Sequence, residues 1–569
     1  MARTLFATLF LAAVALGEDV TLVKDGESDY VIVLCKDASP AEEHGARELQ
    51  SFILQMSGAE LPIKRTDAPF PAHSITVRPP YREYKFVSPE AFLISASLDG
   101  IHINGERPRG AMYGCYAFLE RLGVRWYAPG VTRIPHSPTL TVATFDEASV
   151  PAFEYREPFF TEAFDKDWAA RNRVNGASMH LDESTGGKVT YHPFVHTFEE
   201  IVPGTYFEKH PEYFSLIDGK RFSGYGQRCL SNPDVLKLAI EKVQDWIKTH
   251  PEAQIYSVSQ NDCGNWCQCE GCAAITKKHG AHSGLYLWFV NQVAEAIEKD
   301  HPDKLIDTLA YQFTEAPPKD IVPRKNVRVR LCPIACCEAH PYESCSAAPN
   351  KAFLRHLRGW GEITDTLYIW HYNTDFAHYL MPFPDFDEFP AEARLYKECG
   401  VRGVFFEGAY APGGGGSDAE LRSWVMARLL WDPDQDADAL VTEWMKGVYG
   451  AAWEPMRKWF DLLHERARDP NHHLFIYDPP THPIFSEEVL AAGDALFDEA
   501  EKLATGDDIA VEYVWKARIS LRYLKLARAP KEGPELDGFF ADLRKLGVTQ
   551  PREGQPLDAW EAEFRKRAR

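Results

Sequence analysis

The sequence predicts a mixed α/β protein built around a (β/α)8 barrel of the TIM type. A small α/β domain is expected before the barrel and a helical module after it. Strand-like and helical patterns alternate through the middle of the chain, as they do over the ~250 residues of such barrels. The preceding segment mixes both patterns, and the following segment shows only helical periodicity.

The chain before the barrel contains a targeting segment and one domain. Residues 1–17 join one positive charge to a short apolar run that ends in small residues, which is typical of a signal peptide cut after Gly17. We therefore expect an exported protein, either periplasmic or extracellular. Residues 19–150 form the expected α/β domain, with strands at 30–34, 92–95 and 101–104 and helices at 41–56 and 109–122.

The barrel is expected over residues 151–415. Its eight strands are predicted at 153–160, 177–181, 225–230, 254–259, 305–311, 327–331, 366–372 and 401–406. Amphipathic helices at 234–248 and 284–299 fit between strands, and 213–222 is predicted to be an inserted hairpin that turns at Asp218-Gly219. The glycine run at 413–416 lacks the spacing of a phosphate-binding loop.

The helical module is expected over residues 416–569. Apolar residues recur at helical spacing in five stretches, at 419–430, 437–449, 455–468, 487–504 and 509–527. No pattern in this part of the chain indicates chemistry.

The composition limits the classes of partner. The chain has 62 basic and 83 acidic residues and a net charge of -21, which disfavours nucleic acid and anionic membranes as partners. No later run approaches the ~18 apolar residues of a membrane span. The 14 Trp and 24 Tyr supply flat faces that suit sugar rings, although most of them are expected in cores. A carbohydrate is therefore the expected partner.

Three acidic residues follow predicted barrel strands, where barrel enzymes place catalytic groups. They are Asp262, Asp375 and Glu407. Glycoside hydrolysis needs two carboxyl groups, one to protonate the leaving oxygen and one to attack or to activate water. The alternatives are structural: Asp262 could cap its loop, and Asp375 could be a turn residue or an orienting partner.

Residues that could contact sugar are expected near the same strand ends. They are Asn261, Arg171, His196, Tyr311, Trp370, His371 and Tyr372. A cationic side chain among them would suit a uronate or a sulfate group. For each single His or Arg, an ordinary structural role is the alternative.

A cysteine cluster follows Asp262. Cys267, Cys269 and Cys272, together with Cys229, could form a four-thiolate zinc site, or they could form disulfides in an exported chain. Either arrangement would be structural, because four thiolates leave no open position on the metal. No cofactor is expected for catalysis. Cys336 and Cys345 are candidates for a further disulfide.

Several motifs together resemble known families. GAMYGCYAFLE at 110–120 and GVRWYAPG at 123–130 resemble the domain that precedes the barrel in α-glucuronidases and β-hexosaminidases. The middle of the chain resembles the DUF4838 family through RCLSNP at 228–233, SQND at 259–262, CQCEGC at 267–272, YIWHY at 368–372, PFP at 382–384 and LWDP at 430–433. The resemblance implies an exported, glycoside-hydrolase-like protein and specifies no substrate.

The resemblance also suggests roles for the acidic residues. Hexosaminidase-like enzymes carry their acid after the fourth strand, the place of Asp262, although they have an Asp-Glu pair where this chain has Asn261-Asp262. In α-glucuronidases an Asp and a Glu on late strands handle the attacking water, and Asp375 and Glu407 are similar in order.

The leading hypothesis is an exported glycosidase acting on complex polysaccharide. In it Asp262 donates the proton, Glu407 is the base or nucleophile, and Asp375 orients the second group or the water. The alternative is a non-catalytic carbohydrate-binding protein on the same barrel. A zinc hydrolase centred on the cysteines is less favoured.

Overall fold

The computed structural model of the protein describes residues 19–67, 69–78, 86 and 88–569. The predicted signal peptide at residues 1–17 lies outside the described residues. The chain forms two compact units. The first extends to Arg125 and includes Ile134–Val150 and Glu183–Gly186; the second contains Trp126–Arg133, Pro151–Asp182 and Gly187–Arg569.

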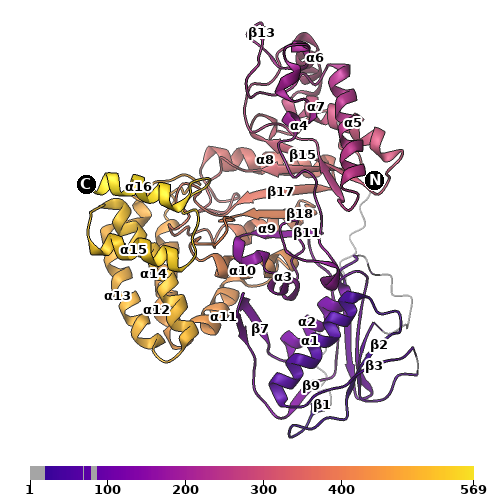
Figure 1. Ribbon diagram of the computed structural model, residues 1–569, viewed down its shortest axis with the longest axis vertical. Coiled ribbons are helices and arrows are strands. Elements are labelled where there is room, and N and C mark those ends of the chain that lie inside the picture. The colour runs from indigo at the N-terminus through magenta and orange to yellow at the C-terminus, as the bar shows by residue number, and fades with distance from the viewer. Residues whose placement is uncertain (1–18, 68, 79–85, 87) are drawn as a thin grey trace. The chain divides into compact units, whose positions relative to one another are not determined.

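A mixed six-stranded sheet forms the centre of the first unit, in the order β10-β5-β6-β4-β2-β3. Its strands are β2 (Val31–Leu34), β3 (Ile63–Arg65), β4 (Ser74–Val77), β5 (Phe92–Ser97), β6 (Gly100–Gly105) and β10 (Phe145–Ser149). Helices α1 (Pro40–Ser57) and α2 (Gly110–Arg121) lie side by side along this sheet (Figure 1). A second, two-stranded sheet pairs β1 (Asp19–Val23) with β9 (Leu140–Ala143).

Local signals in the sequence explain the main elements of this unit. A capping box formed by Ser39 and Glu42 begins α1, and Gly58 ends it in the left-handed conformation that glycine tolerates. The β5–β6 hairpin turns at Leu98-Asp99, and Gly100, the first residue of β6, pairs with Ser97.

Six parallel strands form a curled sheet at the centre of the second unit, in the order β11-β18-β17-β16-β15-β14. They are β11 (Tyr155–Phe159), β14 (Ile255–Ser257), β15 (Leu305–Tyr311), β16 (Val327–Cys332), β17 (Leu367–Tyr372) and β18 (Gly403–Glu407). Every neighbouring pair is parallel, so all six carboxyl ends meet at one edge of the sheet (Figure 1).

The predicted eight-stranded barrel is only partly present, because two predicted strands do not form. Residues 177–181 form turns and irregular structure. In 225–230 the pairing is limited to one antiparallel bridge between Arg228 and Phe214. Six of the eight predicted strands are correct, and they make up the curled sheet.

Two irregular segments bond to the edge strands β11 and β14 in place of the missing strands. Asn175 donates its backbone N–H to the carbonyl of Arg156 (3.2 Å), and Val189 donates to Asn175 (2.9 Å). On the other side, Ile255 donates to Thr190 (3.0 Å). The Asn175 side chain adds two bonds to the β11 region, accepting from Arg156 N–H (2.9 Å) and donating to the Glu154 carbonyl (2.9 Å). The Asn175 side chain thus occupies backbone groups beside β11 that a neighbouring strand would otherwise pair with, and no regular strand forms at this position.

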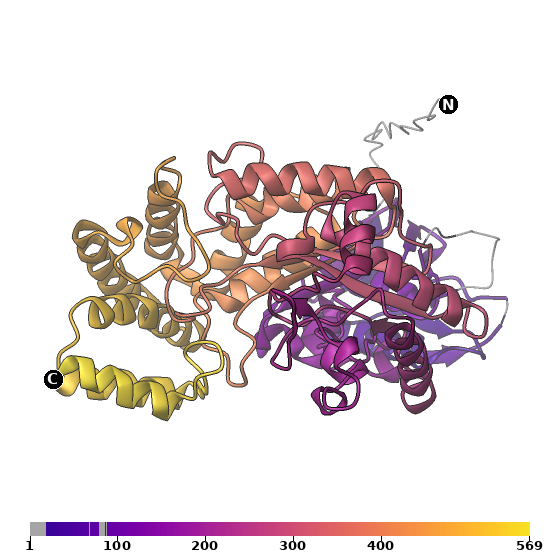
Figure 2. The same ribbon diagram turned by 90° about the horizontal axis from the view of Figure 1, so that it is seen from above.

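Helices flank the curled sheet, and in Figure 2 the long ones run alongside the strands. They are α5 (Pro233–Thr249), α7 (His282–Glu298), α8 (Ala348–Ile363), α9 (Phe389–Glu398) and α10 (Ala419–Trp431). Asn232 caps α5, with its side chain accepting from Asp234 N–H, and Pro233 is the first residue of the helix. Shorter elements of the second unit are β7 (Arg125–Ala128), β8 (Val131–Arg133), α3 (Lys166–Arg171), α4 (Phe198–Ile201), α6 (Glu270–His279) and the predicted hairpin of β12 (Leu216–Ile217) and β13 (Lys220–Arg221).

The C-terminal region is helical, as predicted (Figure 1). It contains α11 (Ala437–Tyr449), α12 (Trp453–Ala467), α13 (Glu487–Ala504), α14 (Asp508–Arg528), α15 (Pro534–Lys545) and α16 (Leu557–Ala568). The last two helices were not expected. None of the helices in the described part of the chain combines the length and the apolar character that crossing a membrane requires.

Two irregular segments of this region return to the loops that follow β16 and β17. Between α12 and α13, Leu474 accepts from Glu338 N–H (2.8 Å) and Ile476 accepts from Phe376 N–H (2.9 Å). Between α15 and α16, Glu553 N–H donates to the Phe376 carbonyl (2.9 Å). The helical region thereby contributes to the strand-end face of the sheet.

Candidate active site

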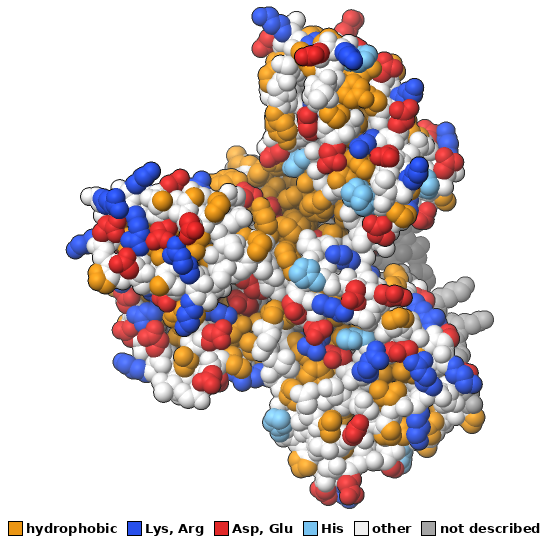
Figure 3. Space-filling view, viewed as in Figure 1, with side chains coloured by type: hydrophobic (Ala, Val, Ile, Leu, Met, Phe, Trp, Pro, Cys, Tyr) orange, Lys and Arg blue, Asp and Glu red, His pale blue; other side chains and the backbone are white. Residues whose placement is uncertain are grey.

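A cavity of about 270 Å³ lies where the strand ends meet the two returning segments. This volume is close to the lower end of the ~300–1,000 Å³ usual for small-ligand sites. Figure 3 shows a hollow with gathered hydrophobic side chains between the α4–α7 part of the second unit and its C-terminal helices. The lining residues are Val195, His196, Asp262, Leu309, Tyr311, Cys332, Ile334, Trp370, Tyr372, Phe376, Glu407, Tyr477 and Glu553.

Glu407 is the buried carboxyl group of this cavity. It is the last residue of β18 and is 8% exposed. The indole Nε1–H of Trp370, on the neighbouring strand β17, donates to its Oε2 at 2.7 Å. Burial raises the pKa of Glu407 to about 8; the Trp370 hydrogen bond opposes this shift, and the charges of Glu553 and Asp262 add to it. A carboxyl group that keeps its proton at neutral pH can serve as a general acid.

Asp262 is the exposed carboxyl group of the same cavity. The Tyr311 hydroxyl, at the end of β15, donates to its Oδ1 at 3.1 Å. Its backbone N–H donates to the Tyr225 hydroxyl at 3.2 Å. Two aromatic hydroxyls thus hold Asp262, one at its carboxylate and one at its backbone.

Buried amides hold the loop that carries Asp262. The Gln227 side chain accepts from Asn261 N–H (3.1 Å) and donates to the carbonyls of Asn261 (2.8 Å) and Cys263 (2.7 Å). The Asn261 side chain donates to Gly226 and accepts from Glu199 N–H. Asn261, predicted to contact substrate, is therefore fully buried and positions the loop instead.

His196 offers a polar atom at the cavity wall. Its Nδ1 lies 2.8 Å from the carbonyl of Gln260, and a carbonyl can only accept, so Nδ1 carries a proton. In the neutral ring Nε2 is then the free acceptor. Aromatic rings of Trp370, Tyr372 and Phe376 make up much of the remaining wall. Such a wall could stack against a sugar ring.

The structure places three other predicted residues away from the cavity lining. Arg171 lies near Asp167 (4.0 Å) and the ring of Trp126. Asp375 is buried and accepts from Ala377 N–H at 2.9 Å, which is the turn role considered as its alternative. Burial raises the pKa of Asp375 to about 8.

His371 is the third of these residues. Its ring is fully buried behind the sheet, with Nε2 3.2 Å from both Glu338 and Glu388. Successive strand residues point to opposite faces, so His371 cannot face the cavity alongside Trp370 and Tyr372. This alternation was visible in the sequence and argued against the prediction.

Phe376, Tyr477 and Glu553 are among the lining residues that the sequence analysis did not predict. Tyr477 and Glu553 come from the irregular segments of the C-terminal region, where helical periodicity gives no signal. Phe376 follows Asp375 in the loop after β17. The one sign of Tyr477 in the sequence was an aromatic residue in a Pro-rich segment, and the structure shows its side chain to be 61% exposed.

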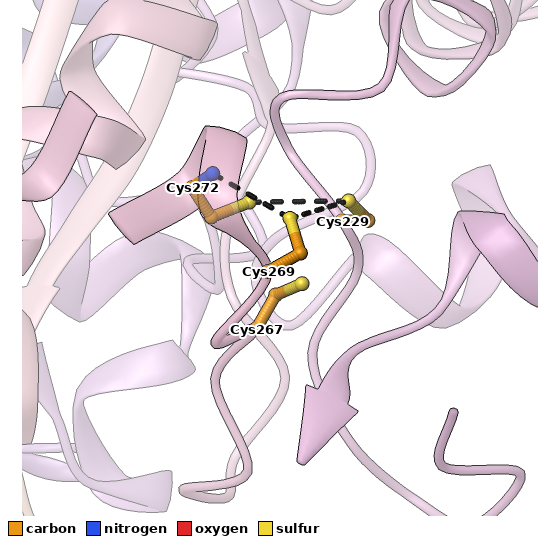
Figure 4. A group of neighbouring side chains, drawn as sticks. All are labelled: Cys229, Cys267, Cys269 and Cys272. Carbon is orange, nitrogen blue, oxygen red and sulfur yellow. Dashed lines mark hydrogen bonds between the residues drawn. The ribbon is translucent and has the colours of Figure 1, made fainter. Parts of the chain in front are cut away.

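The four clustered cysteines point toward one another (Figure 4). Cys229 Sγ lies 3.5 Å from Cys269 Sγ and 3.9 Å from Cys272 Sγ, and all four sulfurs lie within 4.8 Å of one another. A tetrahedral zinc site with Zn–S bonds of about 2.3 Å has sulfur atoms about 3.8 Å apart. The cluster therefore has the dimensions of a four-thiolate zinc site.

The surroundings of this cluster suit thiolates. Backbone N–H groups of Leu216 and Cys272 donate to Cys267 (3.3 Å) and Cys269 (3.5 Å). Hydrogen bonds within the cluster lower the pKa of Cys229, while Cys229 raises the pKa of Cys267 to about 11. A divalent cation would remove this conflict, because it stabilises every thiolate at once.

The expectation of disulfides is wrong. All twelve cysteines lie in the described part of the chain, and each is a free thiol. The predicted Cys336–Cys345 bond is absent because the neighbour, Cys337, turns toward Cys345 instead.

Comparison with known proteins identifies the family. A family model described as "Domain of unknown function (DUF4838)" matches residues 126–461, which is more than half of the chain. The chain belongs to the DUF4838 family. The resemblance seen in the sequence motifs is thereby confirmed. No curated protein matches the sequence.

Solved structures similar to this DUF4838 protein are glycoside hydrolases. A family GH115 4-O-methyl-α-glucuronidase with specificity for decorated arabinogalactans has a TM-score of 0.59 at 14% identity, covering 96% of this chain and 79% of its own. A GH138 enzyme targeting pectin rhamnogalacturonan II has a TM-score of 0.52 at 10% identity, covering 95% and 98%. A chitobiase from Flavobacterium johnsoniae (FjGH20) has a TM-score of 0.47 at 12% identity, covering 97% and 98%.

At these identities the first two matches establish the fold alone. The DUF4838 protein thus has a glycoside-hydrolase-like fold, in which a curled parallel sheet and a helical C-terminal region surround the cavity.

Proposed function

We propose that this protein is a glycoside hydrolase and that the strand-end cavity is its active site. One observation carries the proposal: a buried carboxyl group, Glu407, and an exposed one, Asp262, line the same cavity. Burial raises the pKa of Glu407 to about 8, which suits a proton donor, and glycoside cleavage requires a second carboxyl group beside such a donor as nucleophile or base.

The environments favour roles opposite to those expected from strand order. Glu407, with its pKa raised to about 8, would donate a proton to the leaving glycosidic oxygen. Asp262, held by Tyr311, would attack the sugar or activate water. Glu553, which is exposed in the same cavity, is the alternative second carboxylate.

The residues that line the cavity also indicate which class of sugar it would bind. The GH115 and GH138 enzymes named above act on complex polysaccharides. We propose that the substrate of this protein is also a complex polysaccharide. Among the described residues that line the cavity there are three carboxyl groups and no Lys or Arg. A uronate would meet like charge there, so we propose that the sugar in the cavity is neutral.

Two further proposals concern the whole protein. We propose that residues 1–17 direct its export, as their composition predicts. We also propose that Cys229, Cys267, Cys269 and Cys272 bind a structural zinc ion, whereas cleavage itself needs no cofactor.

The first experiment is a hydrolysis assay of the purified protein on neutral and uronic aryl glycosides and on polysaccharides. Glu407→Gln and Asp262→Asn should each lower kcat/KM by about 10²–10⁴, because each removes one carboxyl group of the pair. Glu362→Gln, on the exposed side of α8, is the matched control and should retain activity.

Full activity in both variants would exclude the cavity as the active site. Glycan binding without turnover on any substrate would instead support the carbohydrate-binding alternative. Preference for uronides would contradict the neutral sugar without contradicting hydrolysis.

A further inference from the structure

A second cluster of metal-binding side chains lies outside the cavity. Cys337, His340 and Cys345 belong to the loop after β16, and His473 belongs to the irregular segment between α12 and α13. One ligand atom from each of the four lies within 4.8 Å of the other three. This cluster could not be recognised in the sequence, because His473 is more than one hundred residues from the other three.

We propose that these two cysteines and two histidines bind a second structural zinc ion. Cys337 Sγ lies 3.5 Å from His340 Nδ1, and Cys345 Sγ lies 3.8 Å from His473 Nδ1. Tetrahedral zinc with bonds of about 2.3 Å to sulfur and 2.0–2.1 Å to nitrogen has sulfur–nitrogen edges of about 3.6 Å. Two thiolates and two imidazoles are a ligand set that zinc prefers.

Neighbouring groups hold the ligands in place, as they do around metal sites. Leu474 N–H donates to Cys337 Sγ at 3.4 Å, and the Ser346 hydroxyl lies 3.2 Å from His473 Nε2, whereas the other ring nitrogen, Nδ1, is the one 3.8 Å from Cys345 Sγ. The buried Asn350 side chain fixes the backbone of Cys337 by two hydrogen bonds of 2.8 Å. The Asn350 and Ser346 contacts orient the donors without using the atoms that would bind the ion, and the N–H bond from Leu474 would stabilise the Cys337 thiolate.

The position of the cluster gives it a function. An ion bound there would tie the loop after β16 to the segment that carries Leu474, Ile476 and Tyr477. Ile476 is bonded to Phe376, and both Phe376 and Tyr477 line the cavity. Because all four ligands come from the protein, the metal would have no open position, and its role would be to hold the cavity wall.

The test begins with the metal content and the zinc X-ray absorption of the full-length protein purified without chelator. We expect two zinc ions per chain and an average of three sulfur and one nitrogen ligands per zinc, from one four-cysteine site and one site with two of each. This measurement on the unaltered protein does not depend on any variant folding.

Variants then assign the second ion. His473→Gln should lose one zinc ion per chain and leave an all-sulfur signal, while His472→Gln, the matched control at the adjacent histidine, should keep both ions. A single zinc ion with four sulfur ligands in the unaltered protein would overturn the proposal. So would a Cys337–Cys345 disulfide found by alkylation and mass spectrometry. Neither result depends on turnover, so the proposed hydrolysis stands or falls separately.

Discussion

At the scale of single residues, the protonation of Glu407 is a balance of opposing contacts. Burial and the charges of Glu553 and Asp262 raise its pKa, whereas the indole of Trp370 stabilises its carboxylate. A hydrogen bond to the charged form lowers a pKa, and removing it must therefore raise the pKa. The direction of this change gives a test of the role of Glu407.

If Glu407 is the proton donor, kcat/KM should fall as the pH rises through about 8, where the group loses its proton. In Trp370→Phe this alkaline limb should move to higher pH, because the carboxylate has lost its indole donor. The pH–rate profile of the variant, beside that of Trp288→Phe on α7, checks this prediction. An alkaline limb that stays in place in Trp370→Phe would contradict the assignment of that limb to Glu407.

The candidate site was only partly predictable at this scale. The prediction succeeded for five residues at or just after strand ends, because the carboxyl ends of parallel strands meet at one edge of the sheet. They are Asp262, Glu407, Tyr311, Trp370 and Tyr372. Glu553 and Tyr477 were not, since they reach the cavity through folding of segments that carry no periodic pattern.

At the scale of elements, the predicted helices and strands are correct where one pattern dominates. The strands β15, β16 and β17 are rich in β-branched, aromatic and other apolar residues, and their predicted ranges nearly coincide with the observed ones. The barrel position beside β11 is different, because the Asn175 side chain bonds to the backbone of Glu154 and Arg156. Strand propensity and hydrophobic periodicity cannot predict that a side chain will form hydrogen bonds in place of a neighbouring strand.

The curled sheet encloses an ion pair that offers a test of its packing. Arg330 on β16 and Asp307 on β15 are both fully buried, with Nε and Oδ2 3.6 Å apart. Aromatic rings of Tyr191, Phe194 and Trp370 surround the guanidinium. Removal of either charge alone would leave the other buried without its partner.

We therefore expect Arg330→Met to lower the free energy of unfolding by about 3–5 kcal/mol at neutral pH. The double variant with Asp307→Asn should lose less than the sum of the two single changes, because it leaves no unpaired charge. Urea unfolding of the four proteins measures the coupling. Strict additivity would mean that the two groups do not interact.

At the scale of the whole molecule, the helical region and the curled sheet jointly build the cavity. Glu553, from the segment between α15 and α16, adds negative charge near Glu407 and raises the pKa of Glu407. The sequence predicted α11 to α14 but neither α15 nor α16, and it predicted no chemistry in this region. Long-range placement of irregular segments depends on tertiary contacts, such as the bond from Glu553 N–H to the Phe376 carbonyl.

Glu553→Gln should lower the pKa of Glu407, because it removes a neighbouring negative charge. The alkaline limb of kcat/KM should then move to lower pH, opposite to the shift in Trp370→Phe. Glu563→Gln, exposed on α16, is the control and should leave the limb in place. If Glu553 is the second carboxylate itself, its replacement will instead remove most of the activity at every pH.

The return of residues 549–555 to the strand ends also concerns biosynthesis. A ribosome that has already translated all six strands of the curled sheet has not yet delivered Glu553, nor the backbone at Pro551 that accepts a hydrogen bond from Tyr379. Glu553 is therefore the last residue of the cavity lining to be synthesised, and the charges around Glu407 are incomplete until it has been added.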